Sequence, residues 1–360
     1  MQNRSDNPSM IQEKRTVEFR PNSRNLFFHI LTACNLSCTH CYINRKQHGT
    51  ATLDQATIES WLRIFSMRDR RKMETDEKRM LRDVEDTNVI FLGGEPTMNP
   101  ALAAGIKAAR EMGYASITVD TNGYLFHDIL DRVSPDQVDY FSFSIDGSCS
   151  RVNDPIRGKG SFDICTSGIR KAVEKGFSVS AIFTCSAKNI HDLSNMPELL
   201  RSLGVTRFFI QVIGLRGKSA SASGDRLQLS RSQWQDIVPE VAVQAARIGL
   251  HVTWPKVFLE PDEEFICAGV AAENFFLFPN GRVYTCPLCE DYPLHAYEIC
   301  DGRLKARPPL NESQLFQLQI PEGCVMNRLF HPGNIDYDEK GMPKNRIACC
   351  MLKEELLPLN

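Results

Sequence analysis

The stretch of sequence that decides the fold is Cys34-Asn35-Leu36-Ser37-Cys38-Thr39-His40-Cys41-Tyr42. It follows the apolar run 26–31, so it forms a loop at the end of an expected strand. Three thiolates within eight residues can converge on one soft metal centre, which is either a zinc ion or an iron–sulfur cluster. Closed structural zinc sites use four protein ligands, whereas a cubane cluster on three thiolates leaves one iron open to a small molecule. The loop therefore predicts a reactive centre.

The composition indicates a globular protein. The 360 residues are 42% hydrophobic, which suffices for one large domain and a smaller one. The net charge of -2 lacks the basic excess of proteins that bind nucleic acid. No run approaches the roughly 18–20 apolar residues of a membrane span, and residues 1–24 lack a signal-peptide core. We therefore expect a cytoplasmic protein that binds neither nucleic acid nor membrane.

The thirteen cysteines are not explained by disulfides. A reducing compartment disfavours a disulfide framework, and an odd count argues the same way. Metal binding explains them better.

Short β-branched or aromatic runs alternate with longer amphipathic stretches from residue 25 onward, which predicts a parallel sheet with crossover helices. The expected strands are 25–32, 88–92, 115–119, 138–145, 178–184 and 207–213. The expected helices are 53–67, 100–112, 162–175, 192–203 and 232–247. Right-handed crossovers wrap six such units into a partial (β/α)6 TIM-like barrel of the α/β class, with its site at the C-terminal ends of the strands.

The alternation of strands and helices ends after residue 247. Two short runs, 275–278 and 282–285, then flank an Asn-Gly turn and predict a β-hairpin. Seven cysteines lie beyond residue 266. We therefore expect a polar tail or short leading strand at 1–24, a core barrel at 25–248 and a small domain at 249–360. The mixed-charge segment 69–86 is interpreted as a solvated helix extension.

The spacing of Cys34, Cys38 and Cys41 closely resembles the signature of the radical S-adenosylmethionine (SAM) superfamily. His40 stands where that family usually has an aromatic residue and is counted with the cofactor-binding residues. The resemblance implies a [4Fe–4S] cluster on these cysteines, with SAM chelating its open iron. Taken alone, the loop also fits a three-thiolate zinc knuckle completed by a remote ligand.

Polar motifs at the expected strand ends resemble the SAM-binding motifs of the family. Gly93-Gly94-Glu95-Pro96 matches the motif whose backbone and glutamate take the SAM amino group, since glycines permit close approach and a carboxylate accepts from an ammonium. Ser144 and Asp146 match the positions that contact the SAM ribose, and Asn122 matches the turn after the third strand. Arg157 is a candidate to bind the SAM carboxylate or the substrate, and Thr184 is a candidate hydroxyl at the end of the fifth strand. For Asn122, a plain turn-forming role is an equal alternative.

The C-terminal cysteines resemble the auxiliary-cluster domains called SPASM and twitch. Cys267 and Cys286 match the opening motif, and a hairpin turning at Asn280-Gly281 would bring both thiols together. The later cysteine block of the full SPASM pattern is absent, which implies one further [4Fe–4S] cluster of twitch type. We assign Cys324 and Cys349 as the other ligands, with Cys289, Cys300 and Cys350 as alternates.

The resemblance implies reductive cleavage of SAM to a 5′-deoxyadenosyl radical, which abstracts hydrogen from a substrate. The substrate would be a peptide or protein side chain or a small cofactor or natural-product precursor, and the electron donor a flavodoxin or ferredoxin. The catalytic residue that returns hydrogen is left open among tyrosines and cysteines such as Cys149, Cys165 and Cys185. The alternative class is a non-catalytic iron–sulfur electron-transfer or metal-sensing protein, which leaves the motifs at 93–96 and 144–146 without a role.

Overall fold

The fold is built on one long, curved sheet, seen in a computed structural model that describes residues 14–66, 85–221, 227–308, 310–326 and 335–358. Within these residues, thirteen strands form the sheet in the order β1-β15-β8-β7-β6-β5-β4-β3-β2-β10-β11-β12-β13. Because β1 and β13 remain as free ends, the sheet does not close into a barrel. The predicted fold class, an α/β protein with a partial barrel, is confirmed.

Seven neighbouring strands run parallel and form the barrel wall. They are β2 Ser23–His29, β3 Asp86–Leu92, β4 Ser116–Thr121, β5 Tyr140–Ser144, β6 Val179–Cys185, β7 Arg207–Val212 and β8 His251–Pro255. The first six confirm the predicted strands with small shifts at their ends. β8 is a seventh parallel strand, and it continues the wall beyond the boundary that we placed near residue 248.

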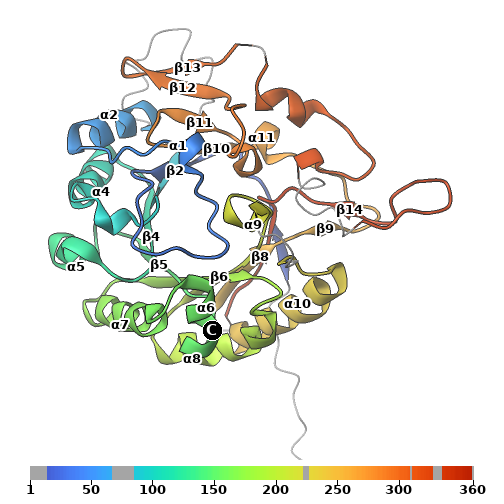
Figure 1. The fold of residues 1–360 in the computed structure, drawn as a ribbon, viewed down its shortest axis with the longest axis horizontal. Coiled ribbons are helices and arrows are strands. Elements are labelled where there is room, and N and C mark those ends of the chain that lie inside the picture. Colours follow the sequence, from blue (N-terminus) through green and yellow to red (C-terminus); the bar gives the residue numbers. More distant parts are fainter. Residues whose placement is uncertain (1–13, 67–84, 222–226, 309, 327–334, 359–360) are drawn as a thin grey trace, which may run out of the picture.

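Helices cover the outside of this wall (Figure 1). They are α2 Gln55–Phe65, α4 Leu102–Met112, α5 Ile129–Arg132, α6 Ser150–Arg157, α7 Ser161–Glu174, α8 Met196–Ser202 and α10 Arg231–Arg247. Local capping sets where two of them begin: the Asp54 carboxylate accepts from Thr57 N at 2.8 Å, and Ser230 forms a capping box with Gln233. Four predicted helices are confirmed within a few residues; the fifth begins as the 3₁₀ turn Ile190–Asn195 before α8.

The C-terminal region adds strands at both ends of the barrel wall. β10 Glu273–Leu277 pairs in parallel with β2, and the predicted hairpin with β11 Arg282–Tyr284 is confirmed. At the other end, β15 Lys353–Leu356 pairs antiparallel with β8. The remaining strands are β1 Arg15–Val17, β9 Phe258–Leu259, β12 Tyr297–Cys300, β13 Arg303–Ala306 and β14 Arg346–Ile347.

One of these pairings revises the predicted organisation of the chain. β1 bonds to β15, so residues 15–17 form the short leading strand rather than a tail. Most of the charged segment 69–86 lies outside the described residues, except that its last residue, Asp86, begins β3. No helix in the part of the chain that the structure describes is long and apolar enough to cross a membrane.

Candidate functional site

The cysteine loop, residues 34–42, crosses the mouth of the barrel between β2 and the short helix α1 Arg45–His48 (Figure 1). The thiols of Cys34, Cys38 and Cys41 are half-buried and lie close enough to interact electrostatically. Burial raises the pKa of Cys34 to about 11. Because metal ligation requires thiolates, binding of iron at this loop must displace protons.

One short loop carries all three thiols. Among the described residues, no group of three or more His, Cys, Asp or Glu side chains is arranged to hold one metal ion. With zinc–sulfur bonds of 2.3 Å, thiolates on one tetrahedral ion lie about 4 Å apart. A multinuclear cluster holds its thiolates further apart, and a cubane on three thiolates leaves one iron open.

The glycines of Gly93-Gly94-Glu95-Pro96 bring the end of β3 against the chain that leads into the cysteine loop. A Cβ on Gly94 would lie 2.1 Å from the carbonyl oxygen of Ala33. Gly94 N donates to Leu31 O at 3.1 Å, and Glu95 N donates to Ala33 O at 3.0 Å. The glycines thus let the end of β3 approach the chain before the cysteine loop, and their predicted contact with SAM stays a prediction.

Glu95 ties the ends of β3 and β4 together. Its side chain is 1% exposed, and its carboxylate accepts from Thr97 N, Thr97 Oγ1 and Thr121 Oγ1 through Oε1, and from Asn122 N at 2.7 Å through Oε2. Burial nevertheless raises the pKa of Glu95. The carboxylate therefore organises two turns, and Oε2 keeps acceptor capacity for one further donor.

Asn122 connects these turns to the cysteine loop. Its Nδ2 donates to Asn35 Oδ1 at 2.8 Å and lies 3.8 Å from the Sγ of Cys34. This buried amide therefore does more than form a turn, because it touches the residues that would carry the cluster.

Three predicted ligand residues meet in one buried network. Asp146 is 0% exposed, its Oδ2 lies 2.6 Å from Arg157 Nε and 3.5 Å from His40 Nε2, and its Oδ1 accepts from Thr184 N. Burial lowers the pKa of His40. Through this ion pair and hydrogen bond, Asp146 helps to hold the cysteine loop, and its predicted ribose contact stays a prediction. Arg157 is likewise engaged with Asp146, not solvated.

The remaining predicted residues of the barrel mouth differ in accessibility. Ser144 is half-buried at the end of β5. Cys165 and Cys185 are fully buried, with Cys165 Sγ near Ser144 O, whereas Cys149 is half-buried. Cys149 is thus the most accessible of the three cysteines considered as hydrogen donors.

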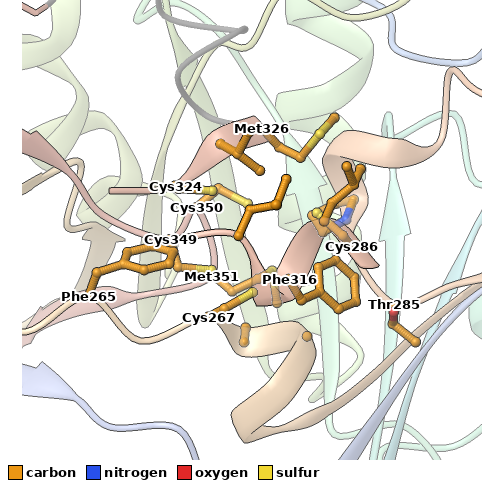
Figure 2. A pocket seen from close by; sticks show the side chains of 16 residues that line it. Phe265, Cys267, Thr285, Cys286, Phe316, Cys324, Met326, Cys349, Cys350 and Met351 are labelled. Carbon is orange, nitrogen blue, oxygen red and sulfur yellow. The ribbon is translucent and has the colours of Figure 1, made fainter. Parts of the chain in front are cut away.

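A second concentration of thiols lies in the C-terminal region. Its cysteines line one pocket of about 440 Å³, counting its open mouth, together with Phe265, Phe316 and Met351 (Figure 2). We call this the C-terminal cysteine pocket, and its cysteines are Cys267, Cys286, Cys324, Cys349 and Cys350. The structure therefore brings the four predicted ligands together and adds the alternate Cys350.

The two other alternates lie outside the lining of this pocket. Cys289 is fully buried and hydrogen-bonds with Cys286 across the 3₁₀ turn Pro287–Cys289. Cys300 lies on β12, in register with Arg303 of β13. All thirteen cysteines lie in described residues and are free thiols, as expected from the disfavoured disulfide framework.

Glu312 holds the backbone beside the C-terminal cysteine pocket in place, and the sequence did not predict this role. Its buried carboxylate accepts from Thr285 N at 2.7 Å, from Cys286 N at 3.2 Å and from Ala296 N at 3.2 Å. Burial raises the pKa of Glu312 to about 7. The residue fixes the backbone at Cys286, but it carries no sequence signal because an isolated glutamate resembles any surface glutamate.

A bridging segment, residues 214–219 after β7, contacts both cysteine sites. The Lys218 amide donates to Cys41 O at 2.9 Å, and Lys218 Nζ donates to Ser37 Oγ at 2.6 Å. Arg216 Nη1 donates to Pro287 O and to Glu290 Oε2, and its guanidinium lies 5.0 Å from the ring centroid of Tyr42. The bridging segment thus links the cysteine loop to the C-terminal cysteine pocket.

Gly217 permits the contact, because its φ of +52° suits glycine and a Cβ there would lie 2.5 Å from Cys41 O. The Gly/Ser-rich composition of the loop was visible in the sequence, but its contacts across the fold were not.

Comparison with known proteins identifies relatives and similar folds. The Fe-coproporphyrin III synthase of Methanosarcina barkeri is 28% identical over 206 residues, which span 56% of this chain but only 46% of that protein. The protein named "Probable GTP 3',8-cyclase" of Saccharolobus solfataricus is 23% identical over 282 residues, spanning 75% of this chain and 84% of that one.

The crystal structure of Streptococcus suis SuiB shares the fold with a TM-score of 0.65 at 13% identity, covering 86% of this chain and 74% of SuiB. SuiB has also been solved bound to its precursor peptide SuiA.

The model of the radical SAM superfamily matches residues 29–216, which include the cysteine loop and most of the barrel wall. This match covers more than half of the 360-residue chain. The protein therefore belongs to the radical SAM superfamily, whose enzymes use a [4Fe–4S] cluster and S-adenosylmethionine.

Proposed function

We propose that Cys34, Cys38 and Cys41 hold the SAM-binding [4Fe–4S] cluster of this enzyme. The donor set itself supports this proposal, because three neighbouring thiols on one loop can ligate three irons of a cubane and leave the fourth iron open. When bound, the cluster and SAM supply the electron and the 5′-deoxyadenosyl radical. The chain's residues hold these groups, orient the substrate and exclude water.

We assign direct SAM contacts to Gly94, Asn122 and Ser144, at the ends of β3, β4 and β5. Glu95 takes part through its Oε2, while most of its carboxylate holds the turns that carry Gly94 and Asn122. The pair Asp146–Arg157 fixes His40, and with it the cysteine loop, against the barrel rim. These assignments separate residues that touch SAM from residues that position them.

The C-terminal cysteine pocket is proposed to hold a second [4Fe–4S] cluster, as in SPASM and twitch domains. The observation that carries this proposal is that five cysteines from four separate segments line one pocket. Four thiolates complete a cubane, so Cys267, Cys286, Cys324 and either Cys349 or its neighbour Cys350 suffice. Such a closed cluster would accept an electron from the substrate, whereas a cluster held by only three of these thiolates would keep one iron open to bind the substrate.

The overall activity is proposed to be hydrogen abstraction from a peptide side chain or a small precursor, driven by electrons from a flavodoxin or ferredoxin. The names of the relatives include a cyclase and a synthase, and SuiB binds a precursor peptide. These names support the two substrate classes equally. The half-exposed inner face of the barrel can admit either a small molecule or one side chain of a peptide.

The proposal is tested by anaerobic reconstitution with iron and sulfide, followed by dithionite and SAM. We expect 5′-deoxyadenosine from the wild type and none from the variant Cys34→Ala/Cys38→Ala/Cys41→Ala, which should keep iron in the C-terminal pocket. Absence of 5′-deoxyadenosine from a wild-type protein shown to carry its clusters would overturn the proposal.

A further inference from the structure

The inner face of the barrel is accessible, in contrast to the packed face under the helices. Phe91 lies near Ile58 of α2 and would meet a side chain at Gly105 of α4, and Phe143 faces Gly168 of α7, so these buried residues point outward. The intervening residues of β3, β4 and β6 point inward and are half-exposed at nearly every position. These partly exposed side chains show that solvent reaches the space inside the wall.

Two opposite charges face this space from different walls. Asp120 is the next-to-last residue of β4, and Lys353 is in register with Pro255, the last residue of β8. Both therefore lie near the C-terminal mouth of the barrel, where the cysteine loop crosses. The strands β5, β6 and β7 separate β4 from β8 in the sheet, so the two side chains approach from opposite sides.

The contacts of the two residues confirm that they point inward. Asp120 accepts a hydrogen bond from Ser142, which lies on the inner face of β5. Lys353 Nζ lies 4.7 Å from the ring centroid of Phe209 on β7. Both charged residues keep part of their surface exposed even though the surrounding strands bury most of it.

The two charges influence each other without joining in an ion pair. Burial raises the pKa of Asp120 to about 7, which Lys353 opposes, and burial lowers the pKa of Lys353, which Asp120 opposes. The other charged groups that act on Asp120 and Lys353 are Glu95 and Cys350. By contrast, Glu355, two residues along β15, is bound by His251 and Arg15. Unpaired charges in a partly desolvated space cost free energy, and a ligand that carries the opposite charge or a hydrogen-bond partner for each would reduce this cost.

We propose that Lys353 and Asp120 are substrate-binding residues, and that the substrate carries a carboxylate for Lys353 and an N–H or O–H donor for Asp120. The inference rests on the proposed function of the barrel mouth and specifies its substrate class. It also gives the C-terminal region a direct role there, because Lys353 comes from β15, only two residues after the pocket residue Met351. Asp120 acts electrostatically on Tyr42, next to Cys41, which places the site beside the cysteine loop.

The experiment uses the full-length protein with glutarate as the carboxylate probe. Glutaramide, which has the same carbon chain but no charge, is the matched control. Lysine acylation by acetic anhydride is followed residue by residue by mass spectrometry, with the exposed Lys107 on the outer face of α4 as the internal control. We expect glutarate to slow acylation of Lys353 severalfold and to leave Lys107 unchanged, and glutaramide to have little effect. Asp120→Asn should strengthen the protection, because it removes the competing negative charge.

A second measurement covers the case in which a variant folds poorly. Glutarate should raise the melting temperature of the wild type and of Lys107→Met, but not of Lys353→Met. Equal protection by glutarate and glutaramide, or no protection at Lys353, would overturn the carboxylate assignment. Neither measurement depends on iron or SAM cleavage, so failure here is distinguishable from failure of the proposed function.

Discussion

At the residue scale, Glu95 shows how one carboxylate can serve a site without facing it. It accepts hydrogen bonds from Thr97, Thr121 and Asn122 while almost entirely buried. An amide in its place would turn an NH₂ group toward these donors. Removing an acceptor from buried donors costs about 1–3 kcal/mol.

We therefore predict that Glu95→Gln lowers the free energy of unfolding by about 1–3 kcal/mol and weakens SAM binding, while iron content stays near that of the wild type. Denaturant unfolding, calorimetry with SAM and iron quantitation measure the three effects. The exposed Glu174→Gln on α7 is the matched control. Unchanged stability and SAM affinity in Glu95→Gln would contradict the assigned role.

His29 is a second buried residue whose state has a measurable consequence. Its Nδ1 lies 3.1 Å from Leu277 O, so this nitrogen carries the hydrogen, and its Nε2 accepts from the Tyr42 hydroxyl at 2.8 Å. The ring also stacks on Phe278 with centroids 4.1 Å apart. Burial lowers the pKa of His29 to about 3. The folded protein therefore holds this ring neutral.

The predicted pH dependence follows from this shift. Between about 3 and the ordinary histidine value of 6.5, the unfolded state binds more protons than the folded state. The free energy of unfolding should thus be insensitive to His29 above pH 6.5 and fall as the pH drops below it. His29→Gln should show a smaller loss of stability between pH 7.5 and pH 5, measured by denaturant unfolding. The exposed His191→Gln should keep the wild-type slope, and a wild-type slope in His29→Gln would refute the prediction.

The sequence revealed which residues gather at the barrel mouth better than it revealed what each one does. Cys34, Glu95, Asn122 and Asp146 all lie there because their motifs end parallel strands, which share one edge. The internal partners of Glu95 and Asp146 were not predictable. A single sequence does not show which donors surround a buried carboxylate, since those donors come from distant segments.

At the element scale, hydrophobic periodicity sufficed for the six predicted strands and failed for the two strands that extend them. β8 and β15 are five and four residues long, and the helix after β8, α11 Ala268–Ala271, has only four residues and does not mark a further repeat. The parallel pairing of β10 with β2 was also missed, because hairpins are expected to pair only with themselves. Long-range pairing of short strands is decided by tertiary packing.

The bridging segment gives a prediction at this scale. Arg216→Ala removes hydrogen bonds to Pro287 and Glu290 and the contact with Tyr42. Bonds from a charged donor are worth about 1.5–3 kcal/mol, so local opening should increase about 10- to 100-fold. Hydrogen exchange should accelerate in residues 34–42 and 286–291 alike.

The matched control for this variant is Arg207→Ala, at the first residue of β7, where the guanidinium lies 4.3 Å from the ring centroid of Tyr140. It should leave both segments unchanged. Acceleration in only one of the two segments of Arg216→Ala would show that the bridging segment does not couple them.

At the scale of the whole molecule, the C-terminal region is continuous with the barrel rather than appended to it. β10 and β15 pair with opposite ends of the parallel wall, and the bridging segment contacts both cysteine sites. The proposed unit at 249–360 therefore shares its sheet with the core. Membership of the radical SAM superfamily supports an enzyme and argues against the non-catalytic alternative.

The most direct test of the two-cluster account is iron quantitation after anaerobic reconstitution. The account predicts about eight irons per chain in the wild type, corresponding to two cubanes. It predicts about four both in Cys34→Ala/Cys38→Ala/Cys41→Ala and in the variant with alanine at all five cysteines of the C-terminal pocket. About four irons in the wild type, or no loss of iron in either variant, would contradict it.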